Sequence, residues 1–248
     1  MKGWTRRDLT IIPLGDKRLV ISCDSCGGTG NKVGDILKVS PYYTAKFTAR
    51  VALTEVICAG AVPFALANGV ACEMNPTGAE MILGIKDELK AAGLNDTILT
   101  GSTEENFATS MTALAVTAIG AADKDSLKFG GASAGDKLIL FGRPLLGSEI
   151  DLDGAGFYDE IKELLAMSGV REIIPVGSKG VEYEAEIAAA LSRVGCKLYQ
   201  TGVDYKKSAG PASCLLVICD EADAVNLTRL GAQVTVIGEF YREDCDLS

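Results

Sequence analysis

The chain has 248 residues, enough for two modest domains that each bury a core of their own. Its content of 48% hydrophobic and 23% charged residues is that of an ordinary globular protein. The formal charge of -9 opposes binding to nucleic acid, so anionic ligands have to be held locally, through metal ions. The sequence has no histidine, which excludes Ser-His and Cys-His nucleophile pairs. Carboxylates, lysines, metals and backbone amides remain, a set that suits phosphoryl transfer.

The chain shows no signal for export or membrane insertion. Its first ten residues contain no apolar run of the kind that a secretory signal needs, so we expect a cytoplasmic protein. The most apolar window, residues 51–72, is long enough to suggest a membrane span, but Glu55, Pro63 and Asn68 interrupt it. This window therefore predicts a buried helix entering a strand. The eight cysteines are expected to be reduced thiols.

The first half of the chain alternates strand and helix signals. Apolar or β-branched runs bounded by turns predict strands, and apolar residues at helical spacing before a glycine predict helices. In chain order the predicted elements are a strand at 18–22, a helix at 44–59, a strand at 65–72, a helix at 76–92, and strands at 97–100, 111–120 and 137–141.

The second half repeats this alternation. Its predicted elements are helices at 157–168, 180–194 and 221–230, and strands at 173–176, 197–201, 215–219 and 233–238. The segment 129–137 between the halves is small and polar, as domain boundaries often are. We therefore predict two domains of mixed α/β structure, residues 1–130 and residues 131–248.

An acidic residue and a glycine-rich loop follow the first predicted strand, in I-S-C-D-S-C-G-G-T-G-N-K at 21–32. Asp24 is suited to hold a divalent metal ion, glycines let backbone amides approach phosphate oxygens, and Lys32 adds a positive charge. The pattern predicts a nucleotide phosphate site, although it also fits a plain turn and is not a Walker A motif. The residues expected at the phosphates are Gly27, Gly28, Thr29, Gly30 and Lys32.

Two further acidic clusters lie at the ends of apolar elements. Glu55 stands in A-L-T-E-V-I-C-A-G-A-V-P, and Glu104 and Glu105 follow a glycine turn in L-T-G-S-T-E-E-N. Together with Asp24 they offer the oxygen ligands that Mg2+ takes. Each also has a plainer interpretation, Glu55 as a partly exposed helix residue and the glutamate pair as the first turn of a helix.

The cysteines near the glycine loop suggest two other kinds of site. Cys23 and Cys26 form a single C-x-x-C with no partner pair, which disfavours zinc. Cys26 itself is either a reactive thiol or a small residue that fills space.

These motifs resemble those of the aminoimidazole ribonucleotide synthetase superfamily. The block around Glu55 is similar to its helix motif N-L-S-D-I-x-A-M-G-A-x-P, in which the acidic residue is a metal ligand. The stretch from Asp24 to Lys32 resembles its D-G-V-G-T-K loop, lengthened here by three residues. L-T-G-S-T-E-E-N looks like its G-G-D-T or G-G-E-T-A-E nucleotide motif, with Ser102 and Thr103 in place of the usual glycine and acid.

The resemblance implies ATP and Mg2+ as cofactors and a homodimer in which the N-terminal sheets form a shared barrel. The C-terminal domain would close over a small-molecule second substrate. The catalytic residues implied are Asp24, Lys32 and Glu104, and the metal ligands are Asp24, Glu55, Glu104 and Glu105. The nucleotide contacts implied are Gly27, Gly28, Thr29, Gly30, Lys32, Gly101, Ser102, Thr103 and Asn106.

The resemblance extends into the second half through the strand openings G-D-K-L-I-L-F-G-R-P and S-A-G-P-A-S-C-L-L-V. R-D-L-T, T-G-S-T-E-E-N and P-V-G-S-K-G-V-E-Y-E-A look most like a compact branch associated with cobalamin lower-ligand salvage, α-ribazole kinase. That branch implies transfer of the ATP γ-phosphoryl group to the 5'-hydroxyl of a nucleoside-like substrate, α-ribazole.

Other reactions of the superfamily remain open. They include thiamine-phosphate phosphorylation, ring closure by a cyclo-ligase, and selenophosphate synthesis, for which Cys26 would be the attractive feature. A non-enzymatic maturation scaffold, with Cys245 carrying a modified group, is a further alternative. The second-domain residues expected to meet the second substrate are Gly177, Ser178, Lys179 and Glu184.

Overall fold

The computed structural model describes residues 2–228 and 233–242, and it divides into two compact units. The first unit comprises Met1–Leu127 with Asp151–Tyr158, and the second comprises Lys128–Ile150 with Asp159–Ser248. A short segment beyond the first half of the chain thus groups with the first unit. The expectation of two domains divided at 130/131 stays a prediction.

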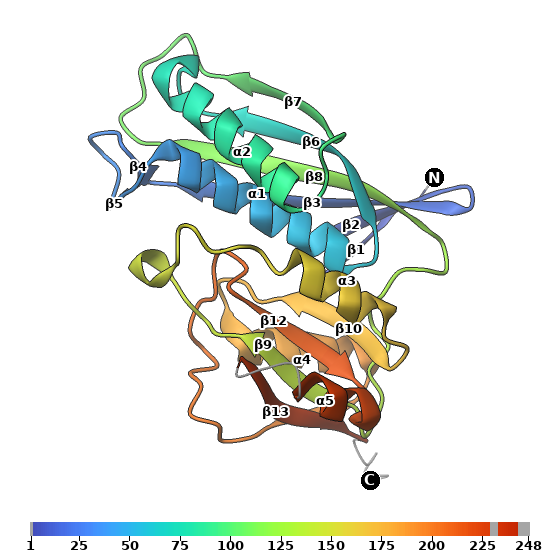
Figure 1. The fold of residues 1–248 in the computed structure, drawn as a ribbon. Helices are drawn as coiled ribbons and strands as arrows, with labels where there is room; N and C mark the ends of the chain where they lie inside the picture. The colour runs from blue at the N-terminus through green and yellow to red at the C-terminus, as the bar shows by residue number, and fades with distance from the viewer. Residues whose placement is uncertain (1, 229–232, 243–248) are drawn as a thin grey trace. The chain divides into compact units, whose positions relative to one another are not determined.

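The first unit is built on a six-stranded sheet with strand order β1-β2-β3-β8-β6-β7 (Figure 1). Neighbouring strands are antiparallel except β6 and β7, which are parallel. The described strands form an open sheet and no closed barrel, so the shared barrel stays a prediction about a dimer. The strands are β1 (Trp4–Arg6), β2 (Leu9–Leu14), β3 (Lys17–Gly27), β6 (Val62–Val70), β7 (Ile98–Thr103) and β8 (Ala113–Asp123), with a separate parallel pair of β4 (Thr29–Gly30) and β5 (Leu37–Lys38).

Two helices, α1 (Pro41–Cys58) and α2 (Ala79–Ala91), cover one face of this sheet (Figure 1). α1 begins with a proline, which has no N–H to leave unpaired, and the Ser40 hydroxyl accepts the Tyr42 N–H. The alanines on the buried side of α1 let it lie close to β3 and β8. α2 crosses α1 closely as well, because Gly84 has no side chain to meet the Tyr42 carbonyl.

The predicted elements of the first unit all exist, but several ends differ. The strand expected at 18–22 continues to Gly27, because every residue from Lys17 onward pairs with β8. Asp24 therefore lies inside a strand, opposite Val116, and not in a loop after it. The strand expected at 97–100 likewise continues to Thr103. The strands β1 and β2, which form one side of the sheet, were not predicted.

A buried polar network joins the segment 151–158 to the first unit. Arg50 donates to both carboxylate oxygens of Glu88 at 2.7 and 3.1 Å and to the Gly154 carbonyl at 2.9 Å. The Tyr158 hydroxyl donates to Glu88 at 2.7 Å. Because Glu88 is fully buried, each of these bonds offsets part of the cost of taking its charge out of water.

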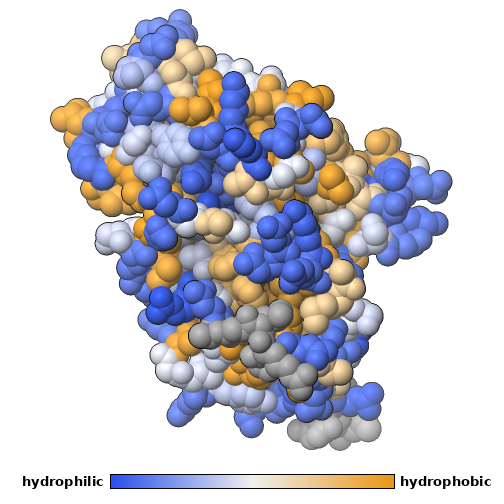
Figure 2. Space-filling view, in the orientation of Figure 1, coloured by the Kyte–Doolittle hydropathy of each residue, from blue (hydrophilic) through white to orange (hydrophobic). Residues whose placement is uncertain are grey.

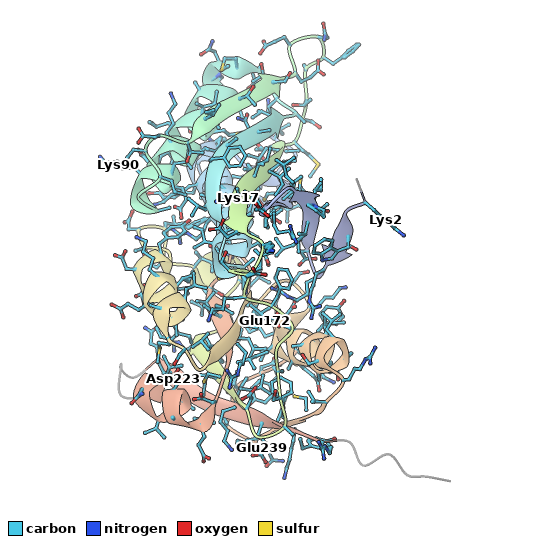
Figure 3. All side chains as sticks on the ribbon, turned by 90° about the vertical axis from the view of Figure 1, so that its right-hand side faces the viewer. Lys2, Lys17, Lys90, Glu172, Asp223 and Glu239 are labelled. Carbon is cyan, nitrogen blue, oxygen red and sulfur yellow. The ribbon has the colours of Figure 1, made fainter. Side chains whose placement is uncertain are left out.

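The second unit is a five-stranded antiparallel sheet with strand order β10-β12-β9-β13-β11. The run C-L-L-V-I-C of β12 is buried along its whole length, as its unbroken apolar sequence predicts. In Figure 3, Glu172, Asp223 and Glu239 mark β10, α5 and β13. The elements are β9 (Lys137–Gly142), β10 (Val170–Pro175), β11 (Gly195–Leu198), β12 (Cys214–Cys219), β13 (Val234–Tyr241), α3 (Tyr158–Ala166), α4 (Gly180–Ser192) and α5 (Glu221–Thr228).

All the elements expected in the second unit are present, with shifted ends. The last two residues of the helix predicted at 221–230 lie outside the described residues, as does Cys245. The visible surface mixes hydrophilic and apolar residues (Figure 2). Among the helices that the structure describes, none is long and apolar enough to cross a bilayer.

Candidate functional site

A cavity of about 360 Å³ lies in the first unit, where β2 begins and β3 continues past it. β2 pairs with β3 only as far as Leu9 opposite Ser22, so the next residues of β3 have no β2 partner. α1 contributes two residues one helical turn apart. The cavity is lined by Asp8, Thr10, Ile21, Ser22, Cys23, Asp24, Val51 and Glu55. Three carboxylates and two hydroxyls give it the hard oxygen donors that Mg2+ takes.

Asp24 carries the clearest electrostatic signature in this cavity. Burial raises the pKa of its carboxyl group to about 6, the charge of Asp8 acts in the same direction, and a hydrogen bond from the Ser25 backbone opposes them. Two carboxylates close together in a partly dry site repel each other, and a divalent cation between them would relieve that repulsion. These carboxylates are oxygen donors of the chemical type that a magnesium ion takes.

Glu55 is only 5% exposed, so its interpretation as a partly exposed helix residue is wrong. Its Oε2 lies 3.5 Å from Nη1 of Arg7, and both side chains are buried. Arg7 and Asp8 form the turn between β1 and β2, which brings this charged pair of residues against α1. Sequence reasoning assigned neither of them a role. The local sequence carries no strong turn signal, because the R-D pair lacks the glycine or asparagine that two-residue hairpin turns favour.

Backbone amides of the glycine-rich loop donate hydrogen bonds to other residues of the chain. The Gly28 N–H donates to the Thr112 carbonyl at 2.8 Å. The Lys32 N–H donates to Asp35 at 2.7 Å, and Asp35 also accepts the Thr112 N–H at 2.7 Å and its hydroxyl at 2.6 Å. Gly28 has a φ of 73°, which glycine adopts without strain. Phosphate binding by these amides stays a prediction, since two of them already have partners.

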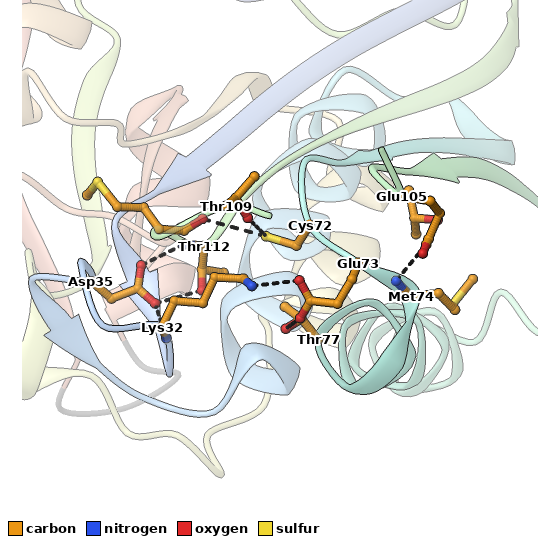
Figure 4. Close-up of polar contacts among 11 residues, drawn as sticks. Lys32, Asp35, Cys72, Glu73, Met74, Thr77, Glu105, Thr109 and Thr112 are labelled. Atoms are coloured by element: carbon orange, nitrogen blue, oxygen red, sulfur yellow. Dashed lines mark hydrogen bonds and ion pairs between the residues drawn. The ribbon is translucent and has the colours of Figure 1, made fainter. Parts of the chain in front are cut away.

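The Lys32 side chain is also engaged (Figure 4). Its Nζ lies 2.6 Å from Oε2 of Glu73, and the Thr77 hydroxyl donates to the other oxygen of the same carboxylate. Hydrogen bonds from Lys32 and Thr77 lower the pKa of Glu73 to about 2. A phosphate group at Lys32 would compete with a carboxylate that is already in place.

The two predicted nucleotide motifs, one beginning at Asp24 and the other containing Gly101, lie at the same register position on different strands of the sheet. Asp24, Val116, Asn68 and Gly101 are in register on β3, β8, β6 and β7. Three strand spacings separate Asp24 from Gly101, or roughly 14 Å. Since a magnesium–oxygen bond is about 2.1 Å long, one ion cannot join both ends of this row within one chain. The Asn68 side chain lies directly over Gly101, where a Cβ would collide with it.

Glu104 and Glu105 follow β7, the strand that carries Gly101, and their carboxylates accept hydrogen bonds from residues in and around their own loop. Glu104 accepts the N–H groups of Asn106 and Phe107, at 2.7 and 3.1 Å. Glu105 accepts from the Met74 N–H and the Thr103 hydroxyl, at 2.8 and 2.7 Å. No helix follows them, so the helix-start interpretation is wrong.

The predicted metal ligands thus divide into two groups. Asp24 and Glu55 line the cavity with Asp8, whereas Glu104 and Glu105 lie in the loop after β7. Within the part of the chain that the structure describes, no three acidic, cysteine or histidine side chains are grouped as a complete metal site. Metal binding by these four carboxylates stays a prediction.

The remaining candidates are the cysteines near the glycine-rich loop and the residues expected to contact the second substrate. Cys23 and Cys26 are three residues apart on one strand and so point to opposite faces, which excludes a shared zinc ion. Burial raises the pKa of Cys26, the opposite of thiol activation. In the second unit, Lys179 Nζ lies 4.1 Å from the centre of the Tyr183 ring, and Glu184 is buried. Substrate contacts by Gly177, Ser178, Lys179 and Glu184 stay a prediction.

Comparison with known proteins places these observations in context. Residues 7–122 match the family described as AIR synthase related protein, N-terminal domain. No curated protein sequence matches the chain. The fold resembles E. coli HypE, a hydrogenase maturation protein, with a TM-score of 0.69 at 20% identity over 91% of this chain and 80% of that one.

Two other structures of this fold are ATP complexes. HypE in complex with ATP gives a TM-score of 0.63 at 18% identity, covering 91% of this chain and 77% of that chain. T. maritima PurL complexed with ATP gives 0.68 at 15% identity, covering 94% of this chain and 42% of that chain. At these identities the likeness establishes the fold: a mixed α/β architecture shared with HypE and PurL, whose first unit matches the AIR synthase related N-terminal domain.

Proposed function

We propose that this chain is an ATP-dependent small-molecule kinase of the AIR synthase related type, which phosphorylates the 5'-hydroxyl of a nucleoside-like substrate, α-ribazole. The observation that carries this proposal is the cavity that Asp8, Asp24 and Glu55 line. It lies within the residues that match the AIR synthase related domain. The ATP complexes of HypE and PurL support a nucleotide as the phosphoryl donor.

The residues take the following roles. Asp8 and Asp24 would hold the magnesium ion that accompanies ATP, and this ion would supply neutralisation of the phosphate charge. Lys32 exchanges its partner Glu73 for a phosphate oxygen. The bond between the γ-phosphorus and the ADP oxygen breaks, the substrate oxygen takes its place, and the hydroxyl proton passes to water or to a carboxylate.

The other predicted contacts are proposed at the nucleotide end of the same surface. They are Gly27, Thr29, Gly30, Gly101, Ser102, Thr103, Glu104, Glu105 and Asn106. We propose a homodimer as the acting species, because the separation between Asp24 and Gly101 within one chain leaves room for a partner chain to complete the site.

Mass spectrometry of a substrate panel tests this proposal. Purified protein with Mg-ATP is offered α-ribazole, thiamine phosphate, formylglycinamidine ribonucleotide or selenide, and we expect one added phosphoryl group on α-ribazole alone. Asp24→Asn should reduce the rate at least roughly 100-fold, since it removes a ligand of the charge-neutralising ion. Asp16→Asn, at an exposed turn of the same sheet, should keep native activity. An active Asp24→Asn enzyme would sink the metal assignment.

The fold shared with E. coli HypE supports a second candidate, a nucleotide-binding maturation protein. HypE has also been solved in a complex with HypF. In this case, ATP and a carbamoyl donor would modify Cys245, and intact-mass measurement would detect the adduct. A Cys245→Ser variant provides the control.

A further inference from the structure

Arg7 holds a backbone conformation that an arginine rarely adopts. Arg6 pairs with Leu9, so Arg7 and Asp8 are the whole turn between β1 and β2, and Arg7 has a φ of 50°. A positive φ at the first residue of a two-residue hairpin turn favours glycine, because a Cβ there crowds the backbone. Such strain persists where surrounding contacts hold the residue in place. The Arg7 side chain is therefore expected to make a compensating interaction.

That interaction is the ion pair with Glu55. Arg7 Nη1 lies 3.5 Å from Glu55 Oε2, and the two side chains are 3% and 6% exposed. Charges so far from solvent interact more strongly than in water, and a buried carboxylate without a cation is costly. Burial raises the pKa of the nearby Cys58 thiol, the charge of Glu55 raises it further, and the charge of Arg7 lowers it. Glu55 is thus neutralised by a cation that belongs to the protein.

The same turn supplies a carboxylate to the cavity. Asp8 follows Arg7 directly, and it lines the cavity together with Asp24 and Glu55. Mg2+ is usually held by one or two protein carboxylates, with waters and substrate phosphates completing its shell. Asp8 and Asp24 meet this requirement without Glu55.

We propose that the Arg7 guanidinium takes the place of a metal ion at Glu55, so that each chain binds one divalent ion, on Asp8 and Asp24, and Glu55 is not a ligand. This inference rests on the proposed function in treating the cavity as the metal site of a nucleotide complex. It departs from the expectation that Glu55 coordinates the ion. The left-handed backbone of Arg7 and its buried pair with Glu55 are its two structural supports.

Electron paramagnetic resonance of Mn2+ tests the proposal without turnover or a second substrate. The full chain is titrated with Mn2+ in the presence of a non-hydrolysable ATP analogue, and we expect one ion per chain. Arg7→Met keeps an apolar stem but removes this cation from beside Glu55, so a second ion should bind, or the first should bind roughly tenfold more tightly. Arg7→Lys keeps the charge and should retain one ion with near-native affinity.

The decisive variant is the double change Arg7→Met with Glu55→Gln. It removes both charges of the buried pair together, and we expect it to fold, as circular dichroism will check, and to keep one Mn2+. Loss of the ion from the folded double variant would overturn the proposal, because Glu55 would then be a ligand. If the double variant does not fold, the native chain still tests the proposal, since two ions per chain overturn it.

The outcomes also separate this inference from the proposed function. A chain that binds one Mn2+ through Asp8 and Asp24, yet phosphorylates none of the panel substrates, would reject the kinase reaction and leave the single-ion site standing. Conversely, an active kinase that holds two ions per chain would reject only the inference about Arg7 and leave the proposed function standing.

Discussion

Asp35 shows how one buried carboxylate can fix a loop. Burial alone would raise its pKa, but hydrogen bonds from Thr112 and Lys32 outweigh burial and hold the pKa below its usual value. Asp35→Asn removes the charge and turns an amide NH2 group toward the N–H and hydroxyl donors of Lys32 and Thr112. We therefore expect the free energy of unfolding to fall by about 2–3 kcal/mol. Urea denaturation measures this loss. Asp16→Asn, in an exposed turn, should change it by less than about 0.5 kcal/mol, and equal losses would contradict the assigned role.

The Lys32–Glu73 pair should make stability depend on acid. The pKa of Glu73 is about 2 in the folded chain, against an ordinary value of 4.5, chiefly because of the hydrogen bond from Lys32. Its stabilisation is therefore complete above pH 4.5 and is lost as the pH falls toward 2. We expect Glu73→Gln to lower the free energy of unfolding by about 1 kcal/mol at pH 7, since the pair is partly exposed. Denaturation at pH 7, 4.5 and 3 should show this difference shrinking, and a constant difference would argue against the pair.

At the scale of elements, the sequence predicted which segments are strands or helices better than it predicted where they end. The alternation in β8 and the apolar positions of α1 are local signals. The last residues of β3 are Cys, Asp, Ser and Gly types with weak strand preference, and they are extended because β8 pairs with them. That pairing is non-local, so the local pattern placed Asp24 in a loop.

The same limit applies to the site. Asp24 and Glu55 were singled out by motif, but nothing in the local pattern joins residue 7 to residue 55 or Lys32 to Glu73. These contacts arise from the turn between β1 and β2 and from the loop before α2. They change the interpretation of Glu55 and Lys32, because both side chains already have partners of opposite charge.

The crossing of α1 and α2 depends on the absence of a side chain at Gly84. A Cβ at this position would collide with the backbone carbonyl of Tyr42, which has no room to rotate away. We expect Gly84→Ala to lower the free energy of unfolding by roughly 1–3 kcal/mol, the usual effect of overpacking. Thermal denaturation measures the effect. Gly131→Ala meets only ordinary van der Waals contact, and a similar loss there would dismiss the steric explanation.

At the scale of the whole molecule, the described helices of the first unit, α1 and α2, lie on one face of its sheet, and none of them lies on the other. α1 and α2 pack on the face that contains Val20, Leu66 and Val116. The register places Val62 and Ile98 on the opposite face, where each is 66% exposed. Large apolar residues exposed on one face of a sheet are consistent with an interaction surface.

This face predicts how the proposed homodimer forms. Charges in the middle of an apolar interface are costly to bury, so we expect the double variant Val62→Glu with Ile98→Glu to convert a native dimer into a folded monomer. Size-exclusion chromatography with light scattering measures the mass, and circular dichroism verifies the fold. Leu83→Glu is the matched control, because Leu83 is 54% exposed on α2, across the sheet from this face, and should leave the dimer intact. A native chain that is monomeric at micromolar concentration, or a double variant that remains dimeric, would show that the open face is not the joint between two copies.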